Sequence, residues 1–392
     1  MSNNGGLTKL DGIEQMRGLA ALGVVVAHAV DTASYLGTRV DGSFLPAVPI
    51  ASAFGTCGVD LFFVISGFVM AHCISQGAPI SATPFLWRRF KRIVPAFWLA
   101  SAALILLRLA FGDPIAPEGL ATTLSIVPLT GQNEYVFPTL YVGWTLAFEI
   151  GFYLMVAIVL ATGCRRASIG VLGLAMAAGL LGTIWQPASI TARFLINPIY
   201  LEFACGVAGQ LLFSRRFFGR HARRALICLL GSFLAMFIVH QIDLGVSLRP
   251  LAVIDGDASL KRALIFGPAF MLLVLGSIEP ERSASRLGQI LLFIGRASYS
   301  LYLTHPLVMV AIGHAEFGAW HPNVYWLVAA LTSGSILLGV LAHQFVERPL
   351  LHLLRRFDFR RVGDCELGSI GYCQSNLAAA QRDNRPRCVA NP

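Results

Sequence analysis

The apolar residues of this chain are gathered into blocks of about twenty, and this grouping constrains the fold more than any other feature of the sequence. A helix of about twenty residues crosses the hydrocarbon core of a lipid bilayer. Only 13% of the 392 residues are charged, about half the share of roughly a quarter that is usual in soluble proteins. The chain is therefore predicted to be an all-α, polytopic membrane helix bundle and not a soluble enzyme.

The blocks with few charges predict about ten transmembrane helices, and an even number places both chain ends on the same side of the membrane. Residues 1–354 are predicted to form one transmembrane domain, and the polar, Arg-rich residues 355–392 a disordered cytosolic tail. The predicted spans run over residues 17–37, 58–76, 93–111, 144–163, 168–185, 195–213, 225–241, 263–278, 297–313 and 323–345.

The positions of the basic residues predict the orientation of the bundle. Of the 30 Lys and Arg residues, 24 fall in segments that the ten spans place on the side of the N-terminus, and only five fall on the other side. Because cytosolic loops accumulate Lys and Arg, both termini are predicted to be cytosolic. The net charge of +9 comes from these short loop clusters, so it gives no indication of nucleic-acid binding.

Several kinds of chemistry lose support because their sequence signatures are missing. The eight cysteines form no C-x-x-C pair and have no zinc-site spacing, so no metal site is predicted. The sequence contains no phosphate-binding loop, G-x-S-x-G turn, H-E-x-x-H pair or G-x-G-x-x-G turn. ATP hydrolysis, serine hydrolysis and zinc catalysis are therefore disfavoured.

The first span carries two ionisable residues, Arg17 and His28, which lie eleven positions apart. Eleven residues turn a helix about 20° beyond three full turns and rise roughly 16 Å, so both side chains are predicted to share one face and to point into one groove. Arg17 could hold an anion at the cytosolic boundary, and His28 could exchange a proton near mid-membrane. The structural alternative is an Arg that snorkels and a His satisfied by a neighbouring carbonyl.

A basic run, WRRFKRIVPAFW, precedes the third span and contains Arg88, Arg89, Lys91 and Arg92. Four cations within five positions suit a phosphate group, because Arg binds phosphate oxygens through a bidentate fork. The alternative is that these charges only set the topology or contact lipid headgroups.

The fourth span, with the motif GWTLAFEIGFYLM, contains Trp144 and places Glu149 inside the membrane with Tyr153 four residues later on the same face. A carboxylate at that depth is expected to have a partner, and His28 or an Arg is the natural candidate. The alternative to a functional role is a structural ion pair between spans.

The ninth and second spans add a further set of polar side chains. In GRASYSLYLTHPLV, Ser298, Tyr302 and His305 recur at positions i, i+4 and i+7, which makes a polar stripe on one helix face. Hydrogen bonding between helices would also explain such a stripe. In GVDLFFVISGFVM, Asp60 is predicted at an outer mouth and Ser66 at a close helix contact.

Taken together, these motifs resemble the acyltransferase 3 family of integral-membrane O-acyltransferases over about residues 10–350. The version of the fourth-span motif found here, with Ile150 where many members have a second Glu, is closer to exopolysaccharide acetyltransferases than to lipopolysaccharide-modifying ones. The motifs appear in family order as LDGIEQMRG followed by His28, GVDLFFVISGF, WRRFKRIVPAFW, GWTLAFEIGFYLM, SYSLYLTHP and FVERPL.

The resemblance implies an enzyme of the bacterial inner membrane that takes an acyl group, expected to be acetyl, from an acyl-CoA such as acetyl-CoA on the cytosolic side. The expected acceptor is a hydroxyl of an exported or cell-surface glycan or of a lipid-linked sugar, with membrane lipids as further partners. Acyl-CoA is expected as a co-substrate, with no permanently bound cofactor.

Carried onto this chain, the family pattern gives Arg17, Arg88, Arg89 and Arg92 as donor-binding residues and His28 and Glu149 as catalytic residues. His28 would act as a general base or as a transient acyl carrier, with Glu149 orienting it or balancing its charge. The supporting polar groups would be Asp60, Ser66, Trp144, Tyr153, Ser298, Tyr302 and His305.

Two other functions use many of the same residues. A proton-coupled transporter of a small solute or glycan precursor would also place His and Glu at mid-membrane. It would predict inverted repeats, and inspection of the sequence reveals none. An inactive scaffold is a third possibility, which the retention of Arg17, His28 and Glu149 disfavours.

Overall fold

The structure is a computed structural model, and it describes residues 11–40, 48–75, 81–128, 134–164, 166–215, 231, 250–256, 258–278, 285–314 and 323–357. These residues are mainly helical and contain no β-strand, which confirms the predicted all-α fold. Eight helices in this part of the chain are long and apolar enough to cross a membrane, so the protein is an integral membrane helix bundle.

The first half of the described chain contains α1 (Asp11–Val40), α2 (Val48–Ser75), α3 (Ala82–Ala110), α4 (Pro117–Ser125), α5 (Gly143–Ala161), α6 (Ala167–Ile184), α7 (Ile190–Leu195) and α8 (Tyr200–Ser214). The second half contains α10 (Pro250–Ile254), α11 (Ser259–Ser277), α12 (Arg286–Arg296), α13 (Ser298–Gly313), α14 (Val324–Ala342), the π-helical turn η1 (His343–Glu347), α15 (Arg348–Leu354) and the 3-10 turn η2 (Arg355–Phe357).

Eight of the ten predicted spans correspond to these membrane-length helices. The predicted ninth span is α13, which is shorter, with 16 residues. The predicted span 225–241 and most of the predicted tail 355–392 lie outside the described residues. The number of ten spans, the orientation and the domain boundary at residue 354 therefore stay predictions.

Three helices extend well beyond their predicted spans at the N-terminal end. The predicted spans begin at residues 17, 58 and 93, whereas α1 begins at Asp11, α2 at Val48 and α3 at Ala82. In α1 and α3 the added residues include charged ones, which hydropathy leaves out although Arg, Lys and Glu are also good helix formers. As a result, the basic run lies inside the first turns of α3, and Pro95 lies within that helix.

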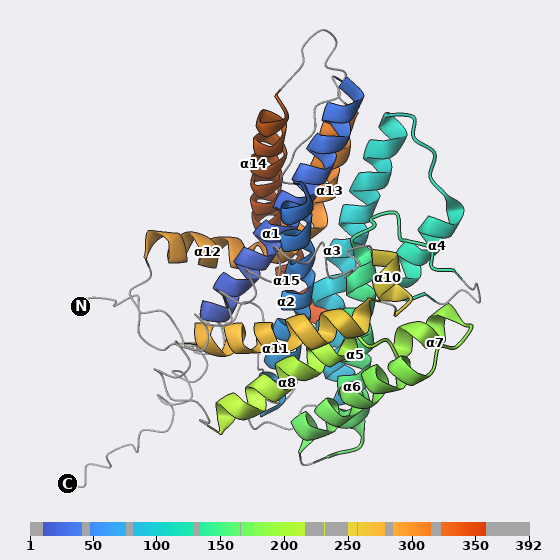
Figure 1. Cartoon of the computed structure of the whole chain (residues 1–392), viewed down its shortest axis with the longest axis vertical. Helices are drawn as coiled ribbons and strands as arrows, with labels where there is room; N and C mark the ends of the chain where they lie inside the picture. Colours follow the sequence, from blue (N-terminus) through green and yellow to red (C-terminus); the bar gives the residue numbers. More distant parts are fainter. Residues whose placement is uncertain are drawn as a thin grey trace, which may run out of the picture.

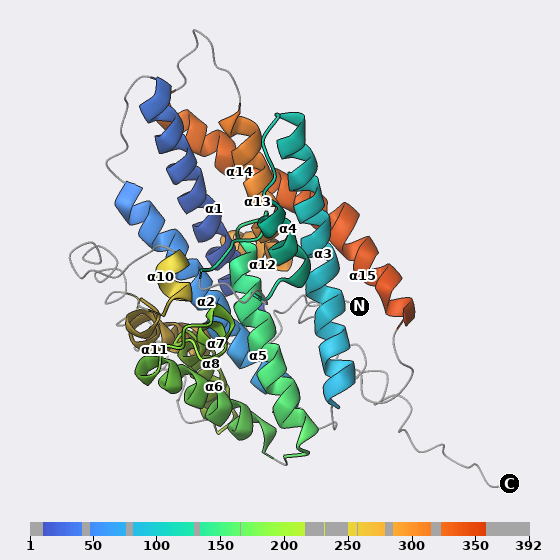
Figure 2. The ribbon, with the colours of Figure 1, turned by 90° about the vertical axis from the view of Figure 1, so that its right-hand side faces the viewer.

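α1 crosses the molecule beside α2, α12, α13 and α14, and α8 and α11 pack on the other side of α2 (Figure 1). The contact between α2 and α8 depends on glycine, because a Cβ on Gly206 would overlap the carbonyl oxygen of Val64. In the view of Figure 2, α3 and α5 run close to each other along the length of the bundle. The N-terminal halves of α1, α3 and α13 line one cavity inside the bundle.

Candidate active site

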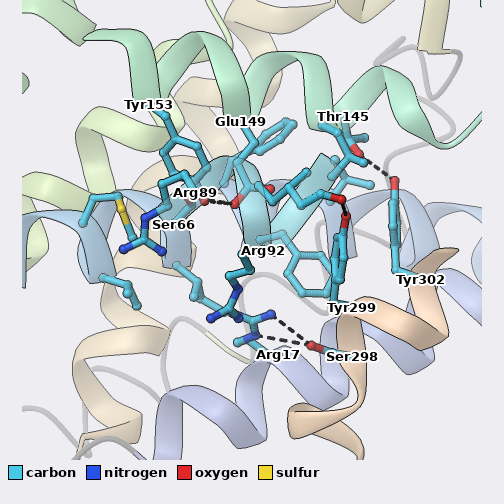
Figure 3. A pocket seen from close by; sticks show the side chains of 18 of the residues that line it. Arg17, Ser66, Arg89, Arg92, Thr145, Glu149, Tyr153, Ser298, Tyr299 and Tyr302 are labelled. Atoms are coloured by element: carbon cyan, nitrogen blue, oxygen red, sulfur yellow. Dashed lines mark hydrogen bonds between the residues drawn. The ribbon is translucent and has the colours of Figure 1, made fainter. Parts of the chain in front are cut away.

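Three arginines line a cavity of about 90 Å³ that is enclosed by α1, α2, α3, α5 and α13 (Figure 3). We call it the arginine cavity. Arg17 comes from α1, and Arg89 and Arg92 come from successive turns of α3. Two carboxylates, Glu14 and Glu149, also line it. Its hydroxyl groups are those of Ser66, Thr145, Tyr153, Ser298, Tyr299 and Tyr302.

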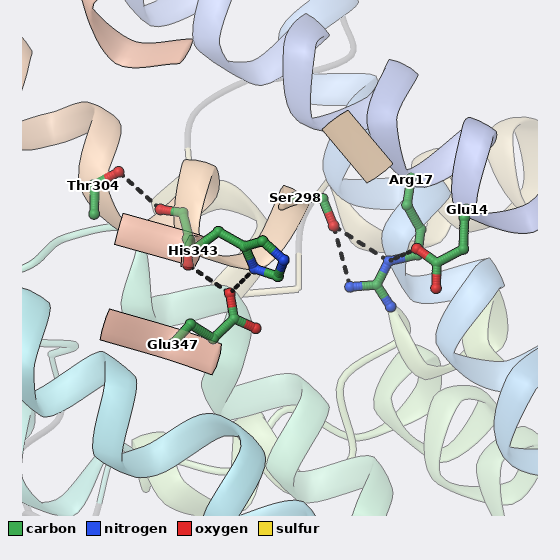
Figure 4. Close-up of polar contacts among 7 residues, drawn as sticks. Glu14, Arg17, Ser298, Thr304, His343 and Glu347 are labelled. Atoms are coloured by element: carbon green, nitrogen blue, oxygen red, sulfur yellow. Dashed lines mark hydrogen bonds and ion pairs between the residues drawn. The ribbon is translucent and has the colours of Figure 1, made fainter. Parts of the chain in front are cut away.

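Arg17 is held in place by the first residue of α13 and by its own helix (Figure 4). Its Nε and Nη2 donate to Ser298 Oγ over 3.3 and 3.2 Å. Its Nε also lies 3.8 Å from a carboxylate oxygen of Glu14, one helical turn earlier. These contacts fix the guanidinium group at the cavity wall.

Arg89 packs against two aromatic rings that also contact each other. Its Cζ lies 5.5 Å from the ring centres of Phe85 and Tyr153, which places the cation within range of both π faces. Its buried Nε has no hydrogen-bond partner among the described residues. The site therefore retains an N–H donor that a bound anion would satisfy.

Glu149 accepts hydrogen bonds from two hydroxyl groups. Tyr153 OH and Ser66 Oγ both donate to its Oε1, the latter over 3.4 Å. Tyr153 thus lies on the same helix face as Glu149, as predicted, and supplies a hydrogen bond where His28 or an Arg was expected as the partner. Glu149 lines the arginine cavity and not the cavity that His28 lines, so a direct role in orienting His28 has no support in the geometry.

His28 lines a second and larger cavity of about 420 Å³, which we call the histidine cavity. Asp31 of α1, Arg108 of α3 and Tyr141, which precedes α5, share its wall. Tyr141 meets the His28 ring edge to face, with ring centres 5.4 Å apart. The segment around α4 and the C-terminal half of α13 supply further walls through Ile115, Ala116, Gly119, Phe137, Pro138, Thr139, Pro306, Met309 and Val310.

The prediction that Arg17 and His28 point into one groove is wrong, because the two residues line different cavities. Side chains of α13 lie between them. The ring centre of His305 is 5.3 Å from that of His28 in a stacked arrangement and 5.9 Å from that of Tyr302. Tyr302 reaches the arginine cavity, where its hydroxyl lies 2.8 Å from Thr145 Oγ1. Three rings thus form a row from one cavity to the other.

The remaining predicted residues divide between the cavities and the protein interior. Ser66, Tyr153, Ser298 and Tyr302 line the arginine cavity, and His305 is fully buried behind His28. Arg88 and Trp144 line neither cavity.

Asp60 was predicted at an outer mouth, and this prediction is wrong. Its carboxylate is buried and accepts hydrogen bonds from Arg262 Nε and Nη2 over 3.1 and 2.5 Å. Arg262, one of the five basic residues that the predicted spans place on the side opposite the termini, is equally buried within α11. The attraction between the opposite charges offsets much of the free energy that each group loses on leaving water. Both side chains can therefore lie in the protein interior.

The structure adds polar residues that the sequence analysis did not select. Asp31 follows His28 by three positions, so helical spacing alone could have identified it. Glu347 of the FVERPL motif accepts hydrogen bonds from Ser300 Oγ over 2.5 Å and lies 2.8 Å from His343 Nδ1 (Figure 4). It is the buried residue of η1, and π-helical turns frequently occur at functional sites.

A charged link lies at the rim of the histidine cavity, beyond the ends of α3 and α13. Asp113 lies 3.1 Å from His314 Nε2 and accepts a hydrogen bond from Arg108 Nε over 3.3 Å. The hydrogen bond with His314 lowers the pKa of Asp113. The Val310 carbonyl and then Asp113 raise the pKa of His314, while Arg108 opposes this change.

Comparison with known proteins reveals a family match and three informative relatives. The family model described as an acyltransferase domain matches residues 10–343. The exopolysaccharide production protein ExoZ of Rhizobium meliloti is 31% identical over 319 residues, which cover 79% of this chain and 92% of that protein. Nodulation protein 10 of Rhizobium leguminosarum bv. viciae is 26% identical over 377 residues, with 88% and 95% coverage.

The O-acetyltransferase OatA of Staphylococcus aureus is 24% identical over 381 residues, which cover 87% of this chain and 57% of that protein. No solved structure matches the chain.

Proposed function

This chain belongs to the acyltransferase 3 family of integral-membrane O-acyltransferases, and on that basis we propose that it transfers an acetyl group from acetyl-CoA to a hydroxyl of an exported polysaccharide. The names of two relatives support this choice, since one is an exopolysaccharide production protein and another an O-acetyltransferase. The bacterial inner membrane is the compartment where a cytosolic acyl-CoA and an exported glycan would meet.

The donor would bind at the arginine cavity, where acetyl-CoA acts as a co-substrate and not as a resident cofactor. Arg17, Arg89 and Arg92 offer guanidinium forks, which suit phosphate oxygens better than a lysine does. The unpartnered Nε of Arg89 is the observation that most favours an anion there. Arg88 lines neither cavity, so we leave it out of the proposed donor site.

Glu149 would act as a positioning residue for the donor site. It holds the Tyr153 hydroxyl, and the Tyr153 ring in turn packs against Arg89. This role replaces the predicted pairing with His28.

His28 would act on the acceptor in one of two ways. As a general base, it takes the proton of the acceptor hydroxyl while the oxygen attacks the thioester carbonyl, and CoA leaves as a thiol after gaining a proton. As a carrier, its ring nitrogen attacks the thioester, CoA leaves, and the acceptor hydroxyl then takes the acyl group from the imidazole. The placement of His28 in a cavity separate from the arginines favours the carrier, because the acyl group must pass from one cavity to the other.

The experiment that tests this function incubates membranes containing the protein with labelled acetyl-CoA and separates the glycans. Transfer of the label to an ester on a glycan is expected. Uptake of a solute or glycan precursor without any transfer of label would overturn the proposal and favour the transporter. Membranes from cells that lack the gene provide the control for other acetyltransferases.

A further inference from the structure

The histidine cavity and the arginine cavity differ in charge, and this difference bears on what each can bind. The arginine cavity holds three guanidinium groups against two carboxylates. The ionisable groups of the histidine cavity are His28, Asp31, Arg108 and Tyr141, and the charge of Arg108 is offset by its ion pair with Asp113 at the rim. Among the residues that the structure describes, the histidine cavity thus lacks the excess of cations that would attract a phosphorylated molecule.

Asp31 gives this cavity its carboxylate. It lies three residues after His28 on the same face of α1, and its side chain is exposed at the cavity wall. It interacts electrostatically with both His28 and Tyr141. A carboxylate in this position accepts hydrogen bonds from any hydroxyl that approaches the His28 ring.

The other walls suit a sugar ring. Tyr141 and Phe137 provide aromatic surface, and Thr32 and Thr139 provide hydroxyl groups. Small-molecule sites commonly combine apolar walls with a few placed polar groups, as this cavity does. The cavity volume of about 420 Å³ falls in the range of roughly 300 to 1,000 Å³ found for such sites.

We propose that the histidine cavity binds the acceptor as an uncharged sugar, and that Asp31 accepts a hydrogen bond from the sugar hydroxyl that approaches His28. This inference rests on the proposed function and adds the class of acceptor and the residue that selects it. An acidic sugar is disfavoured because its carboxylate would lie near that of Asp31.

The test measures transfer of label from acetyl-CoA to a matched pair of small acceptors, methyl glucoside and methyl glucuronide. For the wild-type protein, we expect kcat/KM to be at least about tenfold higher for the glucoside. The reason is that Asp31 repels the carboxylate of the glucuronide, although solvent screens part of this repulsion. Asp31→Asn should lower kcat/KM for the glucoside by about ten- to hundredfold, with an unchanged KM for acetyl-CoA. It should also reduce the preference for the glucoside, and Asp31→Glu should recover part of the activity.

Glu118→Gln is the matched control, because Glu118 is an exposed carboxylate of α4 that does not line the cavity. Glu118→Gln should change neither the rate of label transfer nor the preference for the glucoside over the glucuronide. Equal use of both sugars by the wild-type protein, or wild-type behaviour of Asp31→Asn, would overturn the inference while leaving the proposed function intact.

A second pair of variants tests the cavity without altering its charge. Ala116 lines the histidine cavity, and Ala121, also exposed, lies on the same segment outside the cavity. Ala116→Trp should block transfer to the glucoside and retain acetyl-CoA binding. Ala121→Trp should retain both transfer and acetyl-CoA binding. Full transfer by Ala116→Trp would overturn the assignment of this cavity. Label on neither sugar would overturn the acceptor class, and failure of the wild-type protein to acetylate any glycan would refute the proposed function itself.

Discussion

Arg89 and Arg88 are adjacent in the sequence but occupy different surroundings, and this contrast gives the sharpest test at the scale of single residues. Arg89 packs against two rings and lines the arginine cavity, whereas Arg88 lines neither cavity. If Arg89 grips the donor, Arg89→Ala should raise the KM for acetyl-CoA by about ten- to hundredfold, the effect of losing a charge-assisted hydrogen bond.

Arg89→Lys should recover only part of this loss, because a lysine keeps the charge but lacks the planar fork and stacks less well on the rings. Arg88→Ala is the matched control and should leave the KM close to that of the wild-type protein. A rise in KM as large for Arg88→Ala as for Arg89→Ala would show that the two arginines contribute only general positive charge.

At the scale of helices, the buried pair of Asp60 and Arg262 joins α2 to α11. Arg262→Leu would leave the Asp60 carboxylate buried without its partner, and breaking such a pair typically costs about 3–5 kcal/mol. Thermal unfolding in detergent should therefore detect a large loss of stability. Lys261→Leu is the control, since Lys261 is the adjacent residue and is exposed.

The double variant Asp60→Leu/Arg262→Leu should be less destabilised than Arg262→Leu alone, because no Asp60 charge then remains without a partner. Equal destabilisation of the single and double variants would mean that the size and shape of Arg262, and not its charge, stabilise this contact.

The link between Asp113 and His314, which joins the ends of α3 and α13, should depend on pH. The pKa of His314 is raised from 6.5, so its contribution to stability is complete below that pH and is lost as the pH rises through the raised pKa. The pKa of Asp113 is lowered from 3.8, so its contribution is complete above that pH and is lost as the pH falls through the lowered pKa.

The link should therefore be strongest between about pH 4 and pH 6.5. Melting temperatures of the wild-type protein and of His314→Gln should differ most in this window and converge at alkaline pH. Added salt should weaken the difference because both groups are partly accessible to solvent. A constant difference from pH 5 to pH 9 would contradict the predicted role of the charged His314.

The elements that follow from local sequence could be predicted, and the arrangement of the site could not. Span lengths and the i, i+4 and i+7 spacing depend only on the chain nearby, so the helices and the stripe of Ser298, Tyr302 and His305 were found. The separation of Arg17 from His28 depends on α13, which comes more than 250 residues later and places its rings between them. The pairing of Asp60 with Arg262 depends on similarly distant helices, and no local pattern indicates it.

At the scale of the whole molecule, two cavities of different charge are connected by one row of rings. We propose that the arginine cavity receives the phosphorylated donor and the histidine cavity a hydroxylated acceptor. The neighbouring rings of Tyr302, His305 and His28 lead from one cavity to the other. This arrangement would let a small acyl group move towards the acceptor while the bulk of the donor stays on its own side.

The most direct test of this account is the transfer of labelled acetyl groups to glycan by membranes containing His28→Ala. His352→Ala is the matched control, because His352 is exposed and lines neither cavity. We predict that the transfer rate of His28→Ala is lower than that of the wild-type protein by a factor of about 10² to 10⁴ or more. The variant should still be inserted in the membrane at the wild-type level and should still bind acetyl-CoA. Transfer by His28→Ala at the rate of His352→Ala would contradict the account.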